Sequence, residues 1–463
     1  MTAEILHRLQ FAFTAAFHYL FPPMTIGLGL ILVIMEGTYL ITKKPIYHQM
    51  TRFWVMVYAL NFAVGVVTGI PLEFQFGTNW SNYSRYVGDI FGSALAAEGV
   101  FAFFLESGFL AILVFGWNKV TPKWHFFSTC MVFLGSIFSA TWILVANSWQ
   151  QTPAGFKVVE TEFGPRAHIT DFWAMVFNPS TIDRFTHTVT GCLITGAFLV
   201  MSVSAYYLVK KQHREFSLNS MKIAMALGLI TCVLQMYLGH MSTVNLVKNQ
   251  PSKFAAIEGH YDSNKPLDLV LLGNVNTKTG EVSGLKIPGG GGILLNGDPN
   301  TKVKGFDQIP EQDRPPVTPV FQSFRIMVGL GVLMLGMTLL GTYLVFTNKI
   351  ENATWFLKAL VPAILLPHLA NNTGWMVAEI GRQPWSVYGL LRTSESFSPR
   401  VTVAEVAISL GLFVVLYAGL AALWLYLLDK RIKAGPENLS IEAEPGYAEK
   451  VPVPLTVKEE VTL

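Results

Sequence analysis

The chain has 463 residues, of which 51% are hydrophobic and only 14% are charged. Soluble globular proteins carry about 25% charged residues, so this composition favours a protein that spans a membrane. The formal net charge of +3 is too small to indicate nucleic-acid binding. Cys130, Cys192 and Cys232 lie in apolar segments without a CxxC or CxxCH pattern, which argues against a disulfide framework, a cysteine zinc site and covalently attached haem c.

The N-terminal sequence MTAEILHRLQFAF lacks the pattern of a cleavable signal peptide, because no small-residue cleavage site follows a short apolar core. We expect it to lead into a retained helix. Apolar windows of about 20 residues then recur, each long enough to cross roughly 30 Å of hydrocarbon. Nine spans are predicted, at residues 14–40, 53–76, 93–116, 126–148, 185–209, 219–241, 322–346, 355–379 and 403–428. The expected fold class is an all-α integral membrane protein with about nine transmembrane helices.

Basic residues in the short loops predict the orientation, because cytoplasmic loops are enriched in lysine and arginine. They follow every odd-numbered span: Lys43, Lys44, Arg52, Lys119, Lys123, Lys210, Lys211, Arg214, Lys349, Lys358, Lys430, Arg431 and Lys433. The other connections are longer and mix both signs. The N-terminus is therefore expected outside and the C-terminus in the cytoplasm.

The predicted spans divide the chain into four regions. These are residues 1–241 with six helices and an outer loop at 149–184, an extracytoplasmic loop at 242–321, three helices in 322–428 and a cytoplasmic tail at 429–463. The extracytoplasmic loop contains strand-like runs and glycine turns. Its PGGGG segment is expected to be a flexible hinge rather than a phosphate loop, because no GK[ST] follows it.

Ionisable side chains inside a bilayer cost roughly 2.5–3.5 kcal/mol each, so each one is a candidate for function. On the predicted topology, such residues and possible metal ligands gather toward the outer level of the membrane, with Glu106 eight residues, about 12 Å, deeper than Glu98. They are His18, Glu98, Glu106, His187, His240, Arg325, Met327, Glu379 and Arg382. Each has a plainer explanation when taken alone. A histidine near a helix end is usually interfacial, a methionine usually packs, and Glu379 can pair with Arg382 three residues later. The clustering is what indicates a site.

These residue types suit redox chemistry on haem iron. Imidazole and thioether sulfur are iron ligands, and a His/Met pair makes a six-coordinate electron-transfer centre. A centre that binds oxygen needs five-coordinate iron with an open face, and oxygen reduction consumes protons that carboxylates inside the membrane can relay. The alternative from another class is a proton- or ion-coupled carrier that uses Glu98, Glu106 and Glu379. Such a carrier would be colourless and would need neither His187 nor Met327.

Seven segments of the chain resemble subunit I of the cytochrome bd quinol oxidases: RLQFAFTAAFHYLFPP, NFAVGVVTGIPLEFQFGTNW, AAEGVFAFFLES, WILVANSWQ, RFTHTVTGCLITGA, FRIM and GWMVAEIGRQPW. Together they cover nearly the whole membrane portion. The resemblance implies a haem-bearing subunit that oxidises ubiquinol or menaquinol on the outer side. It also implies reduction of dioxygen to water with cytoplasmic protons, which generates proton motive force without pumping.

The resemblance implies three haems, namely a low-spin haem b, a high-spin haem b and a haem d. A cyanide-insensitive relative with b haems only is the alternative within the family, and the sequence does not decide between them. A second membrane subunit is expected, with small single-helix subunits as a further option. The expected location is the bacterial cytoplasmic (inner) membrane.

Positions within these motifs imply the haem ligands. His187 and Met327 match the axial pair of the low-spin haem b, and Arg325 matches the arginine that supports that haem. His18 and Glu379 match the two ligands of the high-spin pair. Which of the two holds which haem stays open.

The resemblance also implies residues for proton and electron transfer. Glu98 and Glu106 match the carboxylates beside the high-spin pair and on the proton route. Trp375 matches the tryptophan between the haems. Ser139 and Asn147 match polar groups along the fourth span.

Lys253 and Glu258, in the segment KFAAIEG, match a pair implicated in quinol oxidation, and Arg382 matches the arginine of the GRQPW motif. The extracytoplasmic loop is short for the family, because it lacks a long insertion after KFAAIEG. The chain is therefore expected to belong to the short-loop group.

Overall fold

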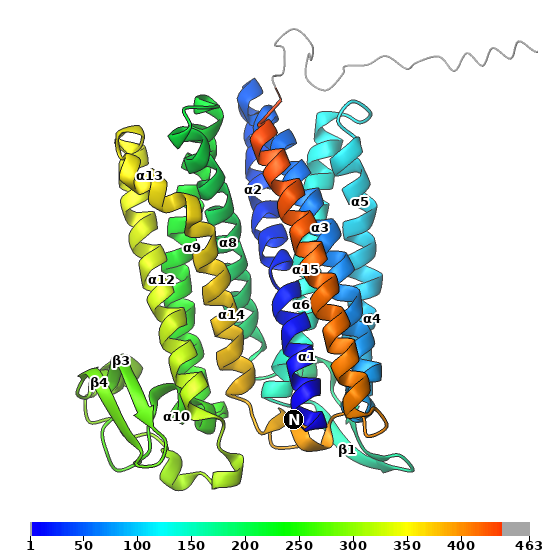
Figure 1. Cartoon of the computed structure of the whole chain (residues 1–463), viewed down its shortest axis with the longest axis vertical. Coiled ribbons are helices and arrows are strands. Elements are labelled where there is room, and N and C mark those ends of the chain that lie inside the picture. Colours follow the sequence, from blue (N-terminus) through cyan, green and yellow to red (C-terminus); the bar gives the residue numbers. More distant parts are fainter. Residues whose placement is uncertain (1, 438–463) are drawn as a thin grey trace, which may run out of the picture.

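The structure is a computed structural model in which residues 2–437 are described. Long helices run side by side in one bundle, and the strands lie at the end of the bundle that carries the N-terminus (Figure 1). Within the described residues, eight helices are long and apolar enough to cross a membrane. The predicted all-α membrane fold is therefore confirmed, while the orientation stays a prediction from the basic loops.

The helices follow the predicted spans but extend past them at most ends. In chain order they are α1 (Ala3–His18), α2 (Phe21–Thr42), α3 (Pro45–Thr78), α4 (Ser81–Ala97), η1 (Glu98–Phe103), α5 (Phe104–Phe115), α6 (Pro122–Gln151), α7 (Phe172–Val176), α8 (Thr181–Val209), α9 (Arg214–Asn249), α10 (Pro251–Glu258), α11 (Gly290–Asn296), α12 (Val317–Phe346), α13 (Thr354–Leu360), η5 (Val361–Ile364), α14 (Leu365–Ile380) and α15 (Val403–Ala434). Short 3-10 turns are η2 (Phe306–Gln308), η3 (Glu311–Asp313), η4 (Ile350–Asn352) and η6 (Thr393–Glu395).

The first predicted span is divided between α1 and α2. Pro22 and Pro23 lie in the first turn of α2. Proline lacks an amide hydrogen and fits the first turn of a helix, but it disrupts a helix interior. Helix α1 therefore ends at His18, which is a candidate ligand.

The predicted span 355–379 consists of α13, η5 and α14 rather than one helix. Pro362 lies in η5, where it cannot donate a helical hydrogen bond. This traversal is therefore not among the eight long helices. The first described residues and the end of α15 lie at opposite ends of the bundle (Figure 1), as an odd number of traversals requires.

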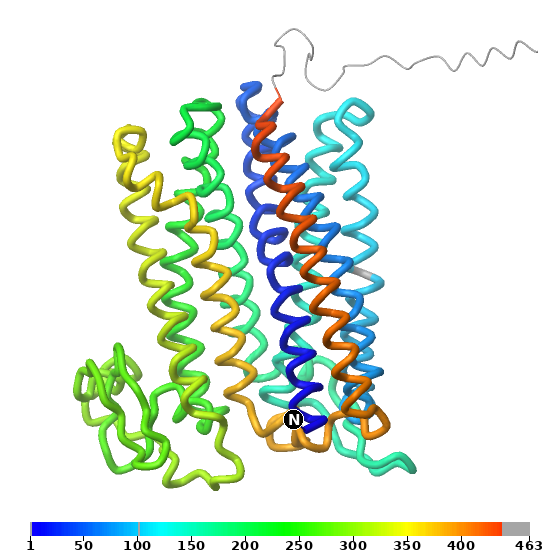
Figure 2. The backbone as a smooth tube through the Cα atoms, viewed as in Figure 1, coloured from blue at the N-terminus to red at the C-terminus, as the bar shows by residue number. Residues whose placement is uncertain are grey.

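Elements from the two ends of the chain pack together. Figure 2 shows α1 beside α15, and Gln10 Nε2 donates a hydrogen bond of 3.1 Å to Ser409 Oγ between them. Helices α2 and α8 cross at glycines, where an added Cβ on Gly27 would lie 2.6 Å from the Gly196 nitrogen. Small residues allow such close approach, which strengthens packing between membrane helices. The largest apolar core surrounds this crossing.

Among residues 2–437, three antiparallel hairpins lie outside the helices. They are β1 (Phe156–Thr161) with β2 (Gly164–Ile169), β3 (Leu269–Asn276) with β4 (Glu281–Ile287), and β5 (Trp385–Val387) with β6 (Leu391–Arg392). The second hairpin confirms the strand-like runs predicted for the long loop. It lies beside α10 (Figure 1).

The PGGGG segment is not a flexible hinge, so that prediction was wrong. Its last three glycines are buried and begin α11. An added Cβ on Gly290 would lie 2.9 Å from Leu269 Cβ, and one on Gly291 would lie 2.7 Å from Leu267 Cγ. The glycines are needed because the start of α11 packs directly against the strand β3 and the residues before it. Most of the predicted tail, residues 438–463, lies outside the described residues.

Candidate functional site

Glu379 lies at the end of α14 and is held by three polar neighbours. Its Oε1 accepts hydrogen bonds from Asn147 Nδ2 at 3.0 Å and Gln151 Nε2 at 3.2 Å. Its Oε2 lies 2.6 Å from Arg382 Nη2, so the simple ion pair considered from the sequence does form. The side chain still keeps 35% of its surface exposed, so these contacts leave the carboxylate accessible to a further ligand.

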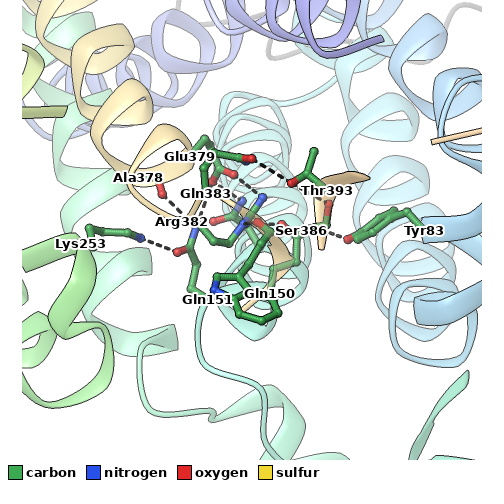
Figure 3. A network of polar contacts seen from close by, with 12 residues as sticks. Tyr83, Gln150, Gln151, Lys253, Ala378, Glu379, Arg382, Gln383, Ser386 and Thr393 are labelled. Carbon is green, nitrogen blue, oxygen red and sulfur yellow. Dashed lines mark hydrogen bonds and ion pairs between the residues drawn. The ribbon is translucent and has the colours of Figure 1, made fainter. Parts of the chain in front are cut away.

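Arg382 connects Glu379 to the rest of this end of the bundle (Figure 3). Its Nη1 donates to Gln150 Oε1 at 2.6 Å and its Nε to the Trp385 carbonyl at 3.2 Å. Gln150 in turn donates to the hydroxyl of Tyr83. The arginine is therefore fixed by α6 and by the turn that follows α14.

His18 is oriented by a threonine on α3. Its Nδ1 lies 3.1 Å from Thr68 Oγ1, and that hydroxyl donates its own hydrogen to the Val64 carbonyl at 2.9 Å. The Thr68 oxygen is then an acceptor for Nδ1–H, so the lone pair of the imidazole lies on Nε2, the arrangement that a metal-binding histidine needs. Gly69 provides space for the ring, because an added Cβ there would lie 3.1 Å from His18 Cε1.

His187 is buried against α9. Its Nε2 lies 3.2 Å from the amide nitrogen of Gln235, and its Nδ1 is buried without a hydrogen-bond partner among the described residues. An added Cβ on Gly239 would lie 3.4 Å from His187 Cε1, so α9 leaves little free space on that side. A buried ring nitrogen without a partner fits a histidine that acts as an iron ligand.

Met327 lies on α12 beside α14. An added Cβ on Gly374 would lie 3.0 Å from the Met327 sulfur. One turn further along α12, a Cβ on Gly331 would lie 3.9 Å from the sulfur of Met236 on α9. The sulfur of Met327 therefore faces α14, whereas the ring of His187 faces Gly239 of α9.

Arg325 uses only one of its three guanidinium nitrogens in hydrogen bonds within the described residues. Its Nη1 donates to the Ile257 carbonyl at 2.7 Å and the Phe321 carbonyl at 3.0 Å, and its guanidinium lies 3.3 Å from the centre of the Phe321 ring. Its Nε and Nη2 are buried and have no hydrogen-bond partner within residues 2–437. Two buried donors of a guanidinium fit a carboxylate such as a haem propionate.

Glu98 and Glu106 lie along α6 rather than at the outer level with Glu379. Ser139 Oγ donates to Glu98 at 2.6 Å. Glu106 accepts from Ser136 and, at 3.3 Å, from the Tyr58 hydroxyl. The structure therefore brings both carboxylates against serines of one helix.

The prediction that Glu98 shares the level of Glu379 is wrong, because the two carboxylates contact different turns of α6. Asn147, which contacts Glu379, lies eight residues along α6 from Ser139, which contacts Glu98, or about 12 Å. The reason is that α4 begins at Ser81 rather than near residue 93, so Glu98 lies far from the start of its helix. Glu98 begins the π-helical turn η1, an irregularity that is frequent at functional sites.

Lys253 and Glu258 share α10 but contact different partners. Lys253 Nζ donates to Gln151 Oε1 at 2.5 Å and to Gln250 Oε1 at 2.8 Å, whereas Glu258 lies 3.8 Å from Arg325 Nη2. Burial lowers the pKa of Lys253 well below its usual value. Burial raises the pKa of Glu258 to about 7, with the positive charge of Arg325 acting in the opposite direction.

Trp375 packs against the break between α1 and α2. Its ring centre lies 5.4 Å from that of Tyr19 in an edge-to-face arrangement, and Tyr19 directly follows His18. Trp375 therefore lies close to the end of α1 that carries a candidate ligand. His240 is exposed on α9 and does not join the site.

Several residues in contact with the candidate site were not found from the sequence. They are Tyr19, Tyr58, Thr68, Ser136, Gln150, Gln151, Gln235 and Gln250. Helical spacing could have indicated two of them. Gln151 lies four residues after Asn147, and Ser136 three residues before Ser139, so each shares a face of α6 with a residue already selected.

Comparison with known proteins supports the resemblance. The family model described as "Cytochrome bd terminal oxidase subunit I" matches residues 6–436. "Cytochrome bd ubiquinol oxidase subunit 1" of Bacillus subtilis is 42% identical and covers 95% of each chain. "Cytochrome bd-II ubiquinol oxidase subunit 1" of Escherichia coli is 35% identical over 94% of this chain and 98% of the relative.

A solved structure agrees with the sequence relatives. The structure of bd oxidase from Geobacillus thermodenitrificans covers 94% of this chain and 99% of its own chain, with a TM-score of 0.87 and 29% sequence identity. The expected multi-pass location in a bacterial inner membrane is likewise confirmed by the long apolar helices and by these bacterial relatives. The chain therefore belongs to the cytochrome bd terminal oxidase subunit I family.

Proposed function

We propose that this chain is the haem-bearing subunit of a terminal quinol:oxygen oxidoreductase. The family match across residues 6–436 carries the proposal, because it covers every candidate site residue. The relatives are named as subunits of quinol oxidases, which supports a second membrane subunit, a quinol donor and dioxygen as the acceptor. Small single-helix subunits are a further proposal.

The ligand residues fit the haems that this reaction needs. His187 and Met327 would hold a low-spin haem b, with Arg325 donating to a propionate. His18 and Glu379 would hold a high-spin haem b and a haem d, or two b haems in the alternative form. When bound, these groups supply the one-electron steps that connect a two-electron quinol to oxygen. Trp375 lies beside the end of α1 and would fill the space between the two ligand sets.

The remaining residues would accept and transfer protons. Glu258 is suited to accept a quinol proton on the outer side, because its pKa of about 7 allows it to bind and release a proton near neutral pH. Glu106 and Glu98 would pass cytoplasmic protons along α6 toward Glu379. Because protons are released on one side and taken up from the other, the reaction separates charge without pumping.

A visible spectrum of the purified complex, made with its second subunit, tests the proposal. The reduced-minus-oxidised spectrum and haem extraction should give three haems. A band of reduced haem d in the red distinguishes the bd form from the form with b haems only. A colourless protein made with ample haem would overturn the proposal and favour the proton- or ion-coupled carrier.

Two ligand variants test the assignment of the low-spin haem. His187→Ala and Met327→Leu should each abolish the low-spin spectrum and quinol oxidation, because the iron loses an axial ligand. An unchanged low-spin spectrum in either variant would contradict the assignment.

A further inference from the structure

Gln151, the last residue of α6, lies between two groups to which separate roles are proposed above. Its Oε1 accepts hydrogen bonds from Lys253 Nζ at 2.5 Å and from Gln250 Nε2 at 2.9 Å. Its Nε2 donates to Glu379 Oε1 at 3.2 Å and to the Ala378 carbonyl at 3.3 Å. Figure 3 shows this side chain between the lysine of α10 and the carboxylate of α14.

These neighbours fix the direction of the amide. Its oxygen faces two donors and its nitrogen faces two acceptors. Reversal of the amide would place its NH2 group against the Gln250 NH2 group and its oxygen against the Glu379 carboxylate, and both contacts would be repulsive. The dipole of Gln151 therefore points along the line that joins Lys253 to Glu379.

The contact is shielded from water. Gln151 is 0% exposed and Lys253 is 1% exposed. Electrostatic effects are stronger in such surroundings, and neighbouring hydrogen bonds polarise one another. A change of charge or position at Lys253 therefore alters the electrostatic potential at Glu379.

A glycine in the GRQPW segment allows this approach. An added Cβ on Gly381 would lie 2.8 Å from Lys253 Cγ, so the lysine stem passes directly over the end of α14. Helix α10, which belongs to the long outer loop, is in this way joined to the helix that carries Glu379.

We propose that Gln151 is a positioning residue that couples Lys253 on the quinol side to Glu379 on the oxygen side. Through this amide, a change at the quinol site alters the surroundings of the Glu379 carboxylate and so the properties of the haem that it would hold. This inference rests on the proposed function.

A double-mutant cycle on the complete oxidase tests the coupling. The midpoint potentials of the haems are titrated in the wild type, in Lys253→Met, in Gln151→Met and in the double variant. Lys253→Met should shift the potential of one high-spin haem in the wild-type background. In the Gln151→Met background the shift should fall to half or less.

Gln250→Met is the matched control, because Gln250 contacts Lys253 and Gln151 but is not a donor to Glu379. In the Gln250→Met background the Lys253→Met shift should keep its full size. Gln151→Asn offers a second variant if Gln151→Met does not fold. Its shorter amide cannot reach both partners, so it should also reduce the shift.

An equal shift in all backgrounds, or no shift in the wild-type background, would overturn the coupling. Loss of the haem spectrum from the wild-type protein would instead overturn the proposed function. The two failures are therefore distinguishable. The quinol KM gives a second readout, because Gln151→Met should lower kcat as well as raise KM if it acts beyond the quinol site.

Discussion

The carboxylate of Glu258 lies 3.8 Å from the guanidinium of Arg325, whereas Lys253 on the same short helix contacts Gln151 instead. The two loop residues that the family resemblance groups together therefore face different parts of the site. Glu258 faces the helix of the proposed low-spin ligand Met327, and Lys253 faces Glu379 through an amide. Each should accordingly respond to a different set of substitutions.

The first prediction concerns the pH dependence of quinol oxidation. Burial raises the pKa of Glu258 to about 7, and only its ionised form can accept a proton. The value of kcat/KM for quinol should therefore rise with pH up to about 7 and level off above it. Arg325→Gln removes the opposing positive charge, so the pKa of Glu258 rises further and the ascending limb moves to higher pH. A Glu258→Gln variant that kept the same ascending limb would contradict this role.

The second prediction concerns the threonine that orients His18. Thr68→Val keeps the shape of the side chain but removes the acceptor for Nδ1–H. Loss of such a partner typically costs about 10–100-fold in metal affinity or activity. Haem content and the high-spin spectrum of the purified complex measure the effect.

Thr25→Val is the matched control for the His18 prediction. Thr25 is also buried, and its hydroxyl donates to the Pro22 carbonyl of its own helix at 3.0 Å. It should leave the spectrum unchanged. An equal loss in the Thr25 and Thr68 variants would indicate a general packing effect instead.

The third prediction concerns the proposed proton route. Glu106→Gln should slow oxygen consumption by roughly 10²-fold or more while leaving haem content intact, because a relay proton is lost but no ligand is. Tyr58→Phe removes a donor to Glu106 and should cause a smaller loss of the same kind. Tyr207→Phe is a suitable control, since this buried tyrosine donates to the Ile432 carbonyl. Wild-type turnover in Glu106→Gln would refute the relay.

The fourth prediction concerns stability. Glu36 is buried, with Oε1 2.6 Å from His125 Nδ1 and Oε2 accepting from Thr129 at 2.5 Å, so it joins α2 to α6. Removal of one partner from a buried hydrogen bond leaves the other group unsatisfied, which costs about 1–3 kcal/mol. Thermal unfolding in detergent should therefore show a clearly lower Tm for Glu36→Ala. Thr42→Val, at an exposed position on the same helix, should change the Tm little; similar Tm values for both variants would exclude the proposed contribution.

Much of the fold could be predicted from hydropathy, because a membrane helix needs a long apolar run and the chain contains these runs. Helix ends were missed where helices continue into polar sequence, as at Ser81 of α4. The broken traversal around Pro362 has the same average hydropathy as a straight helix would have, so only the proline indicated it. The buried glycines before α11 were misread, because a glycine run in a loop has the same composition whether it is flexible or tightly packed.

Two kinds of site residue could be predicted from the sequence. They are residues whose placement inside a bilayer costs free energy and residues that belong to a family motif. Gln151 and Thr68 have neutral side chains, which are common in helices and near helix ends. They do not carry the high free-energy cost of an ionisable group in a bilayer, so the sequence does not single them out. Their importance comes from distance to Glu379 and His18, which a linear sequence does not contain. The depth of Glu98 was also misjudged, since it depends on where α4 begins.

The glycine crossing of α2 and α8 has a consequence for the spacing of the proposed redox centres. Gly27 follows His18 by nine residues, and Gly196 follows His187 by the same number. Each histidine therefore lies roughly the same distance along the chain from the point where the two helix backbones touch. Because there is no room for even a methyl group at that point, the two helix backbones are in direct contact there. The crossing fixes the spacing of α2 and α8 at this level, and with it the lateral separation of the chain segments that lead from His18 and from His187.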